Sequence, residues 1–210
     1  MDISAIRKDY SIKSLDINDV KSDPMRQFSS WFDEAVNAEV LEVNAMTVST
    51  IGMDGVPNAR ILLLKGIDEG FVFFTNYQSE KGKELENKKS ASLTFFWPEL
   101  ERQVRIRGSV EKVTEGESDT YFFSRPLGSQ IGAWASPQSQ PIQSRETLTI
   151  KQAELENKFL SKEITRPPHW GGYRLTPFTL EFWQGRPSRL HDRIKYELQN
   201  GEWMISRLAP

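Results

Sequence analysis

Two arginines and one histidine alternate along a short segment near the C-terminus. In RLHDR, Arg189, His191 and Arg193 stand at positions i, i+2 and i+4. A β-strand with this spacing presents all three side chains on one face. Because cationic groups on one face repel one another, the segment predicts a surface that meets an anionic or electron-rich group. A strand face open to solvent is the alternative.

Further basic residues lie beside expected strand ends and a helix start. Arg60 begins and Lys65 ends the run RILLLK, and their odd spacing places them on opposite faces of a regular strand, where they would serve two different groups. Ser79 opens a polar segment that contains Lys81. Backbone N–H groups at a helix N-terminus, a hydroxyl group and a lysine together favour phosphate binding. An ordinary helix cap with solvated charges is the alternative.

A third basic position occurs within YFFSRPLGSQIGAW. Tyr121, Arg125 and Ser129 are four residues apart, but Pro126 interrupts a continuous helix and disfavours helical geometry at the preceding residue. We therefore expect Arg125 at the start of a new helix, beside the positive end of its dipole. The chain thus offers two separate sets of phosphate donors, which fits one phosphate on a cofactor and another on a substrate.

The composition excludes several other kinds of chemistry. The 210-residue chain has no cysteine and only two histidines, which rules out disulfides, thiolate nucleophiles, cysteine-bound metals and three-histidine metal sites. A net charge of −2 argues against nucleic acid or an anionic membrane as the main partner. No metal-ligand set is evident, so redox chemistry would have to come from an organic cofactor.

The chain length predicts one domain. We place it at residues 23–210 and expect the polar segment 1–22 to form a mobile N-terminal arm or lid. That segment lacks the apolar core of a signal peptide, and no apolar run approaches the ~20 residues of a membrane span. These features favour a cytoplasmic protein with no membrane association.

The elements that must position the basic residues are short strands, turns and a few helices. Helices are expected from Asp23-Pro24 to about residue 40, at 79–88, at about 118–124, after Pro126 and at 144–160. Apolar and β-branched runs predict strands at 46–52, 59–66, 71–76, 91–97, 102–113, 173–176, 179–185, 189–198 and 202–208, with a hairpin at Asn200-Gly201. The pattern predicts an α+β, mainly β protein: a β-barrel with surrounding helices.

Several motifs, in order, resemble the pyridoxine (pyridoxamine) 5′-phosphate oxidase family. They are RILLLK, LERQVRIRG, YFFSRPLGSQIGAW, SPQSQPI, FWQG, RLHDR and the terminal RLAP. The resemblance implies an FMN-binding split β-barrel and a homodimer with both active sites at the subunit interface. It also implies oxidation of pyridoxine 5′-phosphate or pyridoxamine 5′-phosphate to pyridoxal 5′-phosphate in vitamin B6 salvage, with O2 as electron acceptor and H2O2 as product.

The same resemblance implies the residues that contact FMN. Arg60 and Lys81 correspond to ligands of its phosphate. The other implied contacts are Ile61, Leu62, Leu63, Leu64, Lys65, Phe74, Thr75, Gln103, Gln138, Ser139, Trp183 and Arg193. Glu80 stands where some members have arginine, and because a carboxylate cannot donate to phosphate, no contact is expected from it.

The resemblance also implies the residues that bind the substrate. Its phosphate is assigned to Lys65, Tyr121, Arg125 and Ser129. Arg189 and His191 are the implied catalytic residues, which hold the pyridine ring over the flavin. Arg7 and Tyr10 correspond to the ends of an N-terminal lid, in agreement with the arm expected at 1–22.

Three alternatives stay open from the sequence. A flavin reductase, or a split-barrel oxidoreductase with another substrate, would keep Arg60 and Lys81 without needing Tyr121, Arg125, Ser129 or the RLHDR segment. A non-catalytic carrier of FMN or pyridoxal 5′-phosphate would keep them all. A small nucleic-acid-binding barrel is disfavoured by the net charge.

Overall fold

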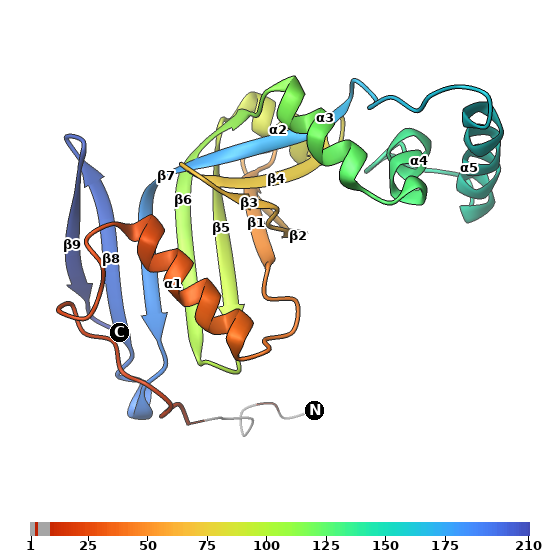
Figure 1. Cartoon of the computed structure of the whole chain (residues 1–210). Helices are drawn as coiled ribbons and strands as arrows, with labels where there is room; N and C mark the ends of the chain where they lie inside the picture. The colour runs from red at the N-terminus through yellow and green to blue at the C-terminus, as the bar shows by residue number, and fades with distance from the viewer. Residues whose placement is uncertain (1–2, 4–8) are drawn as a thin grey trace.

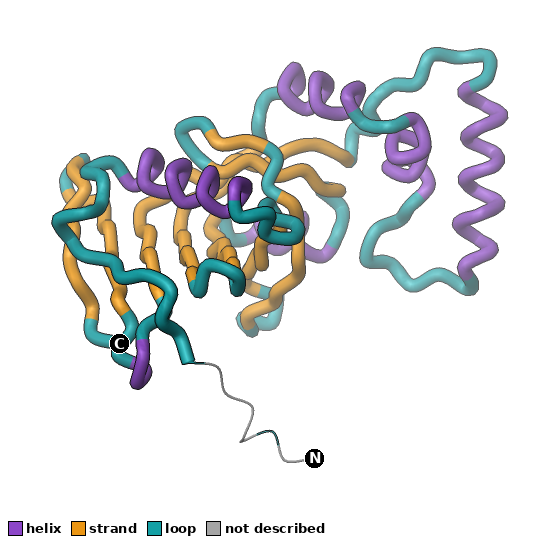
Figure 2. The backbone as a smooth tube through the Cα atoms, turned by 60° about the horizontal axis from the view of Figure 1, so that its bottom comes forward, coloured by secondary structure: helices purple, strands orange, loops and turns teal. Residues whose placement is uncertain are grey.

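A single antiparallel sheet of nine strands organises the described part of the chain, which in this computed structural model comprises residue 3 and residues 9–210. The strands follow the order β2-β1-β5-β6-β7-β4-β3, with β8 and β9 added beside β7. Figure 2 shows them curling into an open half-barrel. Their bounds are β1 Ala45–Ile51, β2 Pro57–Leu63, β3 Gly66–Ile67, β4 Phe71–Asn76, β5 Ser90–Trp97, β6 Arg102–Lys112, β7 Trp170–Gln184, β8 Asp192–Gln199 and β9 Glu202–Leu208.

Strand β7 joins the two parts of the sheet. Along one edge it pairs with β6. Along its other edge, the first six residues pair with β4, and residues 179–184 pair with β8. The sheet therefore divides along β7, so that β4 and β8 lie at opposite ends of this 15-residue strand. The split β-barrel expected from the sequence is confirmed in this mainly β, mixed fold.

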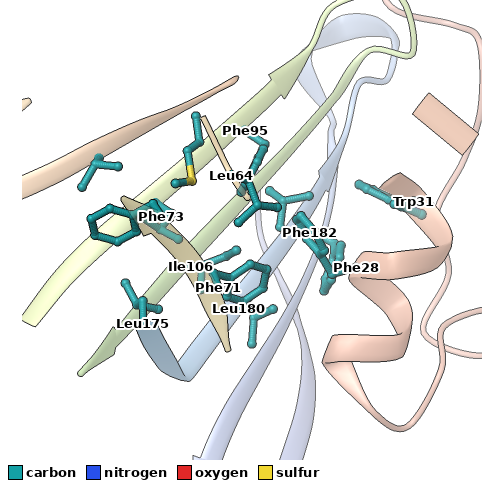
Figure 3. Close-up of a cluster of buried hydrophobic side chains, with 14 of the residues drawn as sticks. Phe28, Trp31, Leu64, Phe71, Phe73, Phe95, Ile106, Leu175, Leu180 and Phe182 are labelled. Atoms are coloured by element: carbon teal, nitrogen blue, oxygen red, sulfur yellow. The ribbon is translucent and has the colours of Figure 1, made fainter. Parts of the chain in front are cut away.

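Helix α1 (Pro24–Asn37) closes one side of the core. Asp23 caps it by accepting a hydrogen bond from the Met25 backbone, and a proline occupies its first turn. Phe28 is fully buried and packs edge-on against Phe71 and Phe95, with ring centroids 4.8 and 5.1 Å away. Figure 3 shows Phe28 and Trp31 facing the sheet from this helix. These aromatic contacts make α1 part of the barrel core rather than a peripheral addition.

The other helices lie at the β4 end of β7. They are α2 Glu80–Asn87, α3 Glu115–Ser124, α4 Leu127–Ala135 and α5 Arg145–Phe159. Thr114 and Glu117 form a reciprocal capping box at the start of α3. Pro126 separates α3 from α4, as expected, and leaves Arg125 in an extended conformation between them. Within the described residues, every helix is too short or too polar to cross a bilayer.

The expectation of a strand from Arg189 onward is wrong. Residues Pro187–Arg189 form a short 3-10 turn, and β8 begins only at Asp192. Ser188 and Arg189 have φ values of +58° and +61°, which no strand contains. Arg189, His191 and Arg193 therefore do not share one strand face. Alternate charged residues mimic a strand pattern, and the sequence carries no equally clear sign of positive φ.

Arg7 lies outside the described residues, which run without a gap from Asp9 onward. Leu15 is buried in the core. The Tyr196 hydroxyl donates to the carbonyl of Lys21 over 2.7 Å. The division between an arm at 1–22 and a domain at 23–210 stays a prediction.

Candidate active site

A cavity of about 270 Å³ opens beside the end of β4. We call it the β4–α3 cavity; its lining residues are Leu62, Leu63, Lys65, Phe74, Thr75, Asn76, Tyr121, Arg125, Gln138 and Trp170. An adjoining cavity of about 240 Å³ shares Arg125, Gln138 and Trp170 with it and adds Ser129. The structure thus brings together residues that the sequence assigned to the substrate phosphate and residues that it assigned to FMN.

Stacked aromatic rings form one wall of the β4–α3 cavity. Phe74 stacks on Tyr121 with 4.0 Å between ring centroids, and on Trp170 with 5.6 Å. The guanidinium of Arg125 lies 4.5 Å from the Trp170 ring centroid, a cation–π contact. Its Nη1 atom is buried without a hydrogen-bond partner, and burial lowers the pKa of Arg125. A buried, unsatisfied donor of this kind fits an anionic ligand.

Lys81 provides a second cation near this cavity, and it is buried. Helix α2 begins as expected, with Ser79 as its N-cap accepting from the Gly82 backbone. The Lys81 ammonium group donates to the Thr75 hydroxyl over 3.3 Å and to the Ser79 hydroxyl over 3.5 Å. It forms no ion pair with a carboxylate among the described residues. Burial, reinforced by the nearby charge of Arg60, lowers the pKa of Lys81. Because an isolated buried charge is costly, this arrangement fits a phosphate at the α2 N-terminus.

Arg60 reaches the same region from β2. Its guanidinium is held 3.0 Å from the Glu84 carboxylate and contacts the Thr50 hydroxyl. Glu84 also accepts from Asn58 over 2.9 Å. Burial acts to raise the pKa of Glu84, but hydrogen bonds from Thr50, Asn58 and Arg60 outweigh it and hold that pKa below its ordinary value. Glu84 therefore stays ionised and fixes the orientation of Arg60.

A second group of predicted residues lies on neighbouring strands near the other end of β7. Gln103 of β6 is paired with Trp183 of β7, which is paired in turn with Arg193 of β8. Directly paired residues lie on the same face of a sheet. The His191 ring packs against Trp183 with 4.6 Å between centroids. We call Gln103, Trp183, His191 and Arg193 the Trp183 cluster.

Hydrogen bonds fix two members of the Trp183 cluster. Arg193 donates to the Glu181 carboxylate over 2.9 Å and to the Ala209 carbonyl over 2.8 Å. The backbone N–H of Arg186 donates to Nδ1 of His191 over 3.1 Å. Because Nδ1 accepts this bond, a neutral His191 carries its proton on Nε2. The ring therefore offers an N–H donor on the side away from the Arg186 backbone.

The β4–α3 cavity and the Trp183 cluster are far apart in one chain. Trp170 and Trp183 lie 13 positions apart on β7, which is at most about 40 Å for an extended strand. Figure 1 shows one end of β7 beside α3 and the other, beyond a bend in the strand, beside β8. One chain alone therefore does not bring Arg125 beside His191.

Some predicted residues have other surroundings. Leu64 packs its side chain into the core, and Ile61 is 64% exposed. Arg189 is exposed in the 3-10 turn, and Ser139 is exposed with a φ of +67°. Lys65 follows β2 rather than ending it, and its side chain lines the β4–α3 cavity while Arg60 points toward Glu84.

Sequence reasoning missed three residues of the candidate site. Trp170 and Asn76 line the β4–α3 cavity, and Glu84 orients Arg60. The only sign of Trp170 was an aromatic residue at the start of a strand, which more commonly belongs to a core. Glu84 follows Lys81 by three positions, which indicates a helical ion pair and not a partner on β2.

Comparison with known proteins identifies the family. Residues 32–159 match the family described as pyridoxamine 5′-phosphate oxidase. The chain belongs to the pyridoxamine 5′-phosphate oxidase family. Residues 170–210 match its second part, described as the pyridoxine 5′-phosphate oxidase C-terminal dimerisation region. That region includes Trp183, His191 and Arg193, so most of the Trp183 cluster belongs to the dimerisation region of this oxidoreductase family.

Relatives in the pyridoxamine 5′-phosphate oxidase family match almost the whole chain. A pyridoxine/pyridoxamine 5′-phosphate oxidase of Ralstonia pickettii is 59% identical over 210 residues, covering 99% of both chains. One from a Cyanothece species is 54% identical over 209 residues, covering 99% of this chain and 98% of the relative. The resemblance inferred from the motifs is thereby confirmed.

Solved structures show the same fold. PhzG from Burkholderia lata, solved with tetrahydrophenazine-1-carboxylic acid, is 33% identical with a TM-score of 0.89, covering 95% of this chain and all of that one. A pyridoxamine 5′-phosphate oxidase-related, FMN-binding protein from Nostoc punctiforme is 16% identical with a TM-score of 0.71, covering 90% and 98% of the two chains. The fold of this chain is therefore that of the pyridoxamine 5′-phosphate oxidase family.

Proposed function

We propose that this chain oxidises pyridoxine 5′-phosphate or pyridoxamine 5′-phosphate to pyridoxal 5′-phosphate, with O2 as electron acceptor and H2O2 as product. The observation that carries the proposal is a pair of cations with no carboxylate partner among the described residues: Lys81, which is buried, and Arg125, which is half-buried with a buried Nη1 atom. Two such cations fit two bound phosphates, one on a cofactor and one on a substrate. Near-full-length identity of 54–59% to proteins of this name supports the choice.

FMN is the cofactor that membership of this family gives the chain. The residues present fit FMN, because Lys81, Arg60 and the Ser79-capped start of α2 form a cationic region that can bind a phosphate. Within it, Lys81 has only hydroxyl partners among the described residues. Bound FMN would supply the redox chemistry, which is hydride acceptance from the substrate carbon and electron transfer to dioxygen. In this assignment Leu62, Leu63, Phe74, Thr75 and Gln138 line the remainder of its binding region.

Arg125 and Lys65 hold the substrate phosphate in this proposal. Both line the β4–α3 cavity, together with the Tyr121 hydroxyl, and Ser129 lines the adjoining cavity. A phosphate is remote from the carbon that reacts, so these residues act by positioning the ring. The cation–π contact with Trp170 keeps the Arg125 guanidinium directed into the cavity.

A second copy of the chain supplies the Trp183 cluster in this proposal. The cluster and the β4–α3 cavity lie toward opposite ends of β7, yet both contain residues that the sequence assigned to one site. The position of Trp183, His191 and Arg193 within a dimerisation region supports their approach to a partner's cavity. There Arg189 and the Nε2–H of His191 would orient the pyridine substituents, and Arg193 would lie near the FMN and favour negative charge there.

The structure of PhzG raises a second candidate substrate, a tricyclic carboxylic acid such as the one in that complex. Such a ligand has no phosphate for Lys65, Tyr121, Arg125 and Ser129. The identity to PhzG is also lower than the 54–59% to the oxidases. These observations favour the phosphorylated pyridine.

An absorption spectrum of the purified protein tests the proposal. Bound flavin gives a yellow protein, and we expect anaerobic pyridoxine 5′-phosphate or pyridoxamine 5′-phosphate to bleach it. Admission of oxygen should restore the colour and release hydrogen peroxide. A flavin that stays oxidised with both compounds, or that responds equally to pyridoxine without phosphate, would contradict the proposal.

A further inference from the structure

The Tyr10 side chain covers part of the Trp183 cluster of its own chain. Its ring lies edge-on to Trp183, with 5.7 Å between centroids and an interplanar angle of 90°. It also lies 6.0 Å from the His191 ring. The contact depends on Gly185, since a Cβ atom there would lie 2.7 Å from the Tyr10 Cβ. Tyr10 therefore packs closely against backbone next to the cluster.

Glu101 holds the residues that follow Tyr10. One oxygen of its carboxylate accepts hydrogen bonds from the backbone N–H groups of Ser11 and Ile12, over 2.8 and 3.1 Å. Glu101 is only 2% exposed and adopts a positive φ of 53°. Its own carbonyl accepts from the Gly185 backbone over 2.8 Å. A buried carboxylate in this position fixes the path of the N-terminal segment next to Gly185.

Asp192 forms a second anchor a few residues further on. Its carboxylate accepts from the Leu15 backbone over 3.0 Å and from Arg207 over 2.8 Å. Arg207 in turn donates to the Leu15 carbonyl over 3.1 Å and to Asp16 over 2.9 Å. Both backbone groups of Leu15 are thus held by one ion pair. Asp192 is the residue of RLHDR between His191 and Arg193, to which the sequence assigned no role.

We propose that Glu101 and Asp192 are positioning residues that hold residues 9–16 against the Trp183 cluster, so that Tyr10 forms one wall of the ligand site. This inference rests on the proposed function, because that function makes the cluster part of the site. Neither carboxylate touches the substrate, and both act through the backbone of residues 11–15. The anchored segment covers His191 of its own chain. In a shared site, one copy would therefore supply the β4–α3 cavity, and the other would supply both the Trp183 cluster and residues 9–16.

The test compares Glu101→Ala with Glu101→Gln, using hydrogen exchange and steady-state kinetics. Glu101→Ala removes the acceptor, so the amides of Ser11 and Ile12 should exchange faster while those of β5 and β6 keep their protection. KM for pyridoxamine 5′-phosphate should rise about tenfold with FMN content unchanged. Glu101→Gln keeps a carbonyl acceptor and should restore most of the protection and of the wild-type KM.

Two glycine variants complete the test and guard against a folding defect at Glu101. Gly185→Ala removes neither carboxylate, but its Cβ would lie 2.7 Å from the Tyr10 Cβ and 3.0 Å from the Glu101 Cβ, so it should displace Tyr10 and raise KM as Glu101→Ala does. Gly116→Ala is the matched control, because a Cβ there meets no atom within 4 Å, and it should behave as wild type. Asp192→Asn should loosen Leu15 and raise KM to a smaller extent.

Three outcomes would overturn the inference. One is unchanged exchange at Ser11 and Ile12 in Glu101→Ala, which would show that Glu101 is no anchor. Another is faster exchange with an unchanged KM, which would show that the segment takes no part in the site. The third is Gly185→Ala with wild-type kinetics. If the wild type oxidises no phosphorylated pyridine, the proposed function fails by itself, and exchange still decides whether Glu101 anchors the segment.

Discussion

The guanidinium of Arg125 lies 4.5 Å from the ring centroid of Trp170, and its Nη1 atom is buried without a hydrogen-bond partner. The contact with the indole ring directs the cation into the β4–α3 cavity, where Lys65 also lies. An arginine held in this position can bind an anionic ligand that enters the cavity.

Replacing Arg125 should therefore weaken substrate binding. Loss of charge-assisted hydrogen bonds costs about 1.5–3 kcal/mol, so Arg125→Ala should raise KM for pyridoxamine 5′-phosphate about 10- to 100-fold. Steady-state kinetics measure the change, and FMN content should be that of the wild type. Arg145→Ala, which changes an exposed arginine at the start of α5, is the control and should have no effect. An unchanged KM in Arg125→Ala would remove Arg125 from the phosphate site.

Lys81→Met should affect cofactor binding and apoprotein stability in opposite directions. The substitution removes a buried charge with no carboxylate partner among the described residues, so the apoprotein should be at least as stable as wild type. FMN affinity should fall about tenfold or more, because a charge-assisted contact is lost. Thermal unfolding of the apoprotein and flavin fluorescence titration measure the two effects. Lys83→Met on the same helix is exposed and serves as the matched control.

FMN affinity should depend on pH in the alkaline range. Burial lowers the pKa of Lys81 in the apoprotein, so this lysine loses its proton at a lower pH than an ordinary lysine, whose pKa is about 10.4. Phosphate binding requires the charged form. Affinity is therefore full below the lowered pKa and falls as pH rises through it, by up to about tenfold per pH unit.

Titrations of the apoprotein with FMN across the alkaline range measure this decline. Lys81→Arg keeps its charge at every pH used, since the guanidinium pKa exceeds about 12. The FMN affinity of this variant should therefore stay constant across the same pH range. A decline of equal steepness in Lys81→Arg would assign the pH dependence to another group.

Mixing two impaired variants, assayed at a substrate concentration well below their KM values, tests whether the site is shared between copies. In one chain Arg125 and Arg189 lie toward opposite ends of β7. If each site takes the cavity from one copy and the RLHDR segment from another, a mixed dimer of Arg125→Ala and Arg189→Ala contains one intact site. Random exchange of subunits should then restore about a quarter of the wild-type activity.

The control for this experiment mixes Arg125→Ala with Lys65→Ala. Both residues line the same β4–α3 cavity, so no combination of these chains contains an intact site. Activity should stay at the level of the separate variants. Restoration in this control, or its absence in the first mixture, would contradict a site shared between copies.

Local sequence patterns predicted most of the secondary structure because their causes are local. Asp23-Pro24, Ser79 and Pro126 mark helix boundaries through capping and the missing proline N–H, and the structure places helix boundaries at each of them. The motifs also determined the family, since they occur in order along the chain. The RLHDR segment shows the limit of such patterns, because the positive φ of Ser188 and Arg189 depends on the turn that joins β7 to β8.

Only the tertiary structure decided which charges have partners. Arg60 and Lys81 are both basic residues beside expected element ends, yet Arg60 is paired with buried Glu84 and Lys81 has only hydroxyl partners among the described residues. The division of the sheet along β7 likewise separates Arg125 from His191. The hydrogen bonds of Glu101 to the N-terminal segment bring Tyr10 onto Trp183. These relationships join residues distant in sequence, so they follow from strand pairing and burial and have no local pattern that would reveal them.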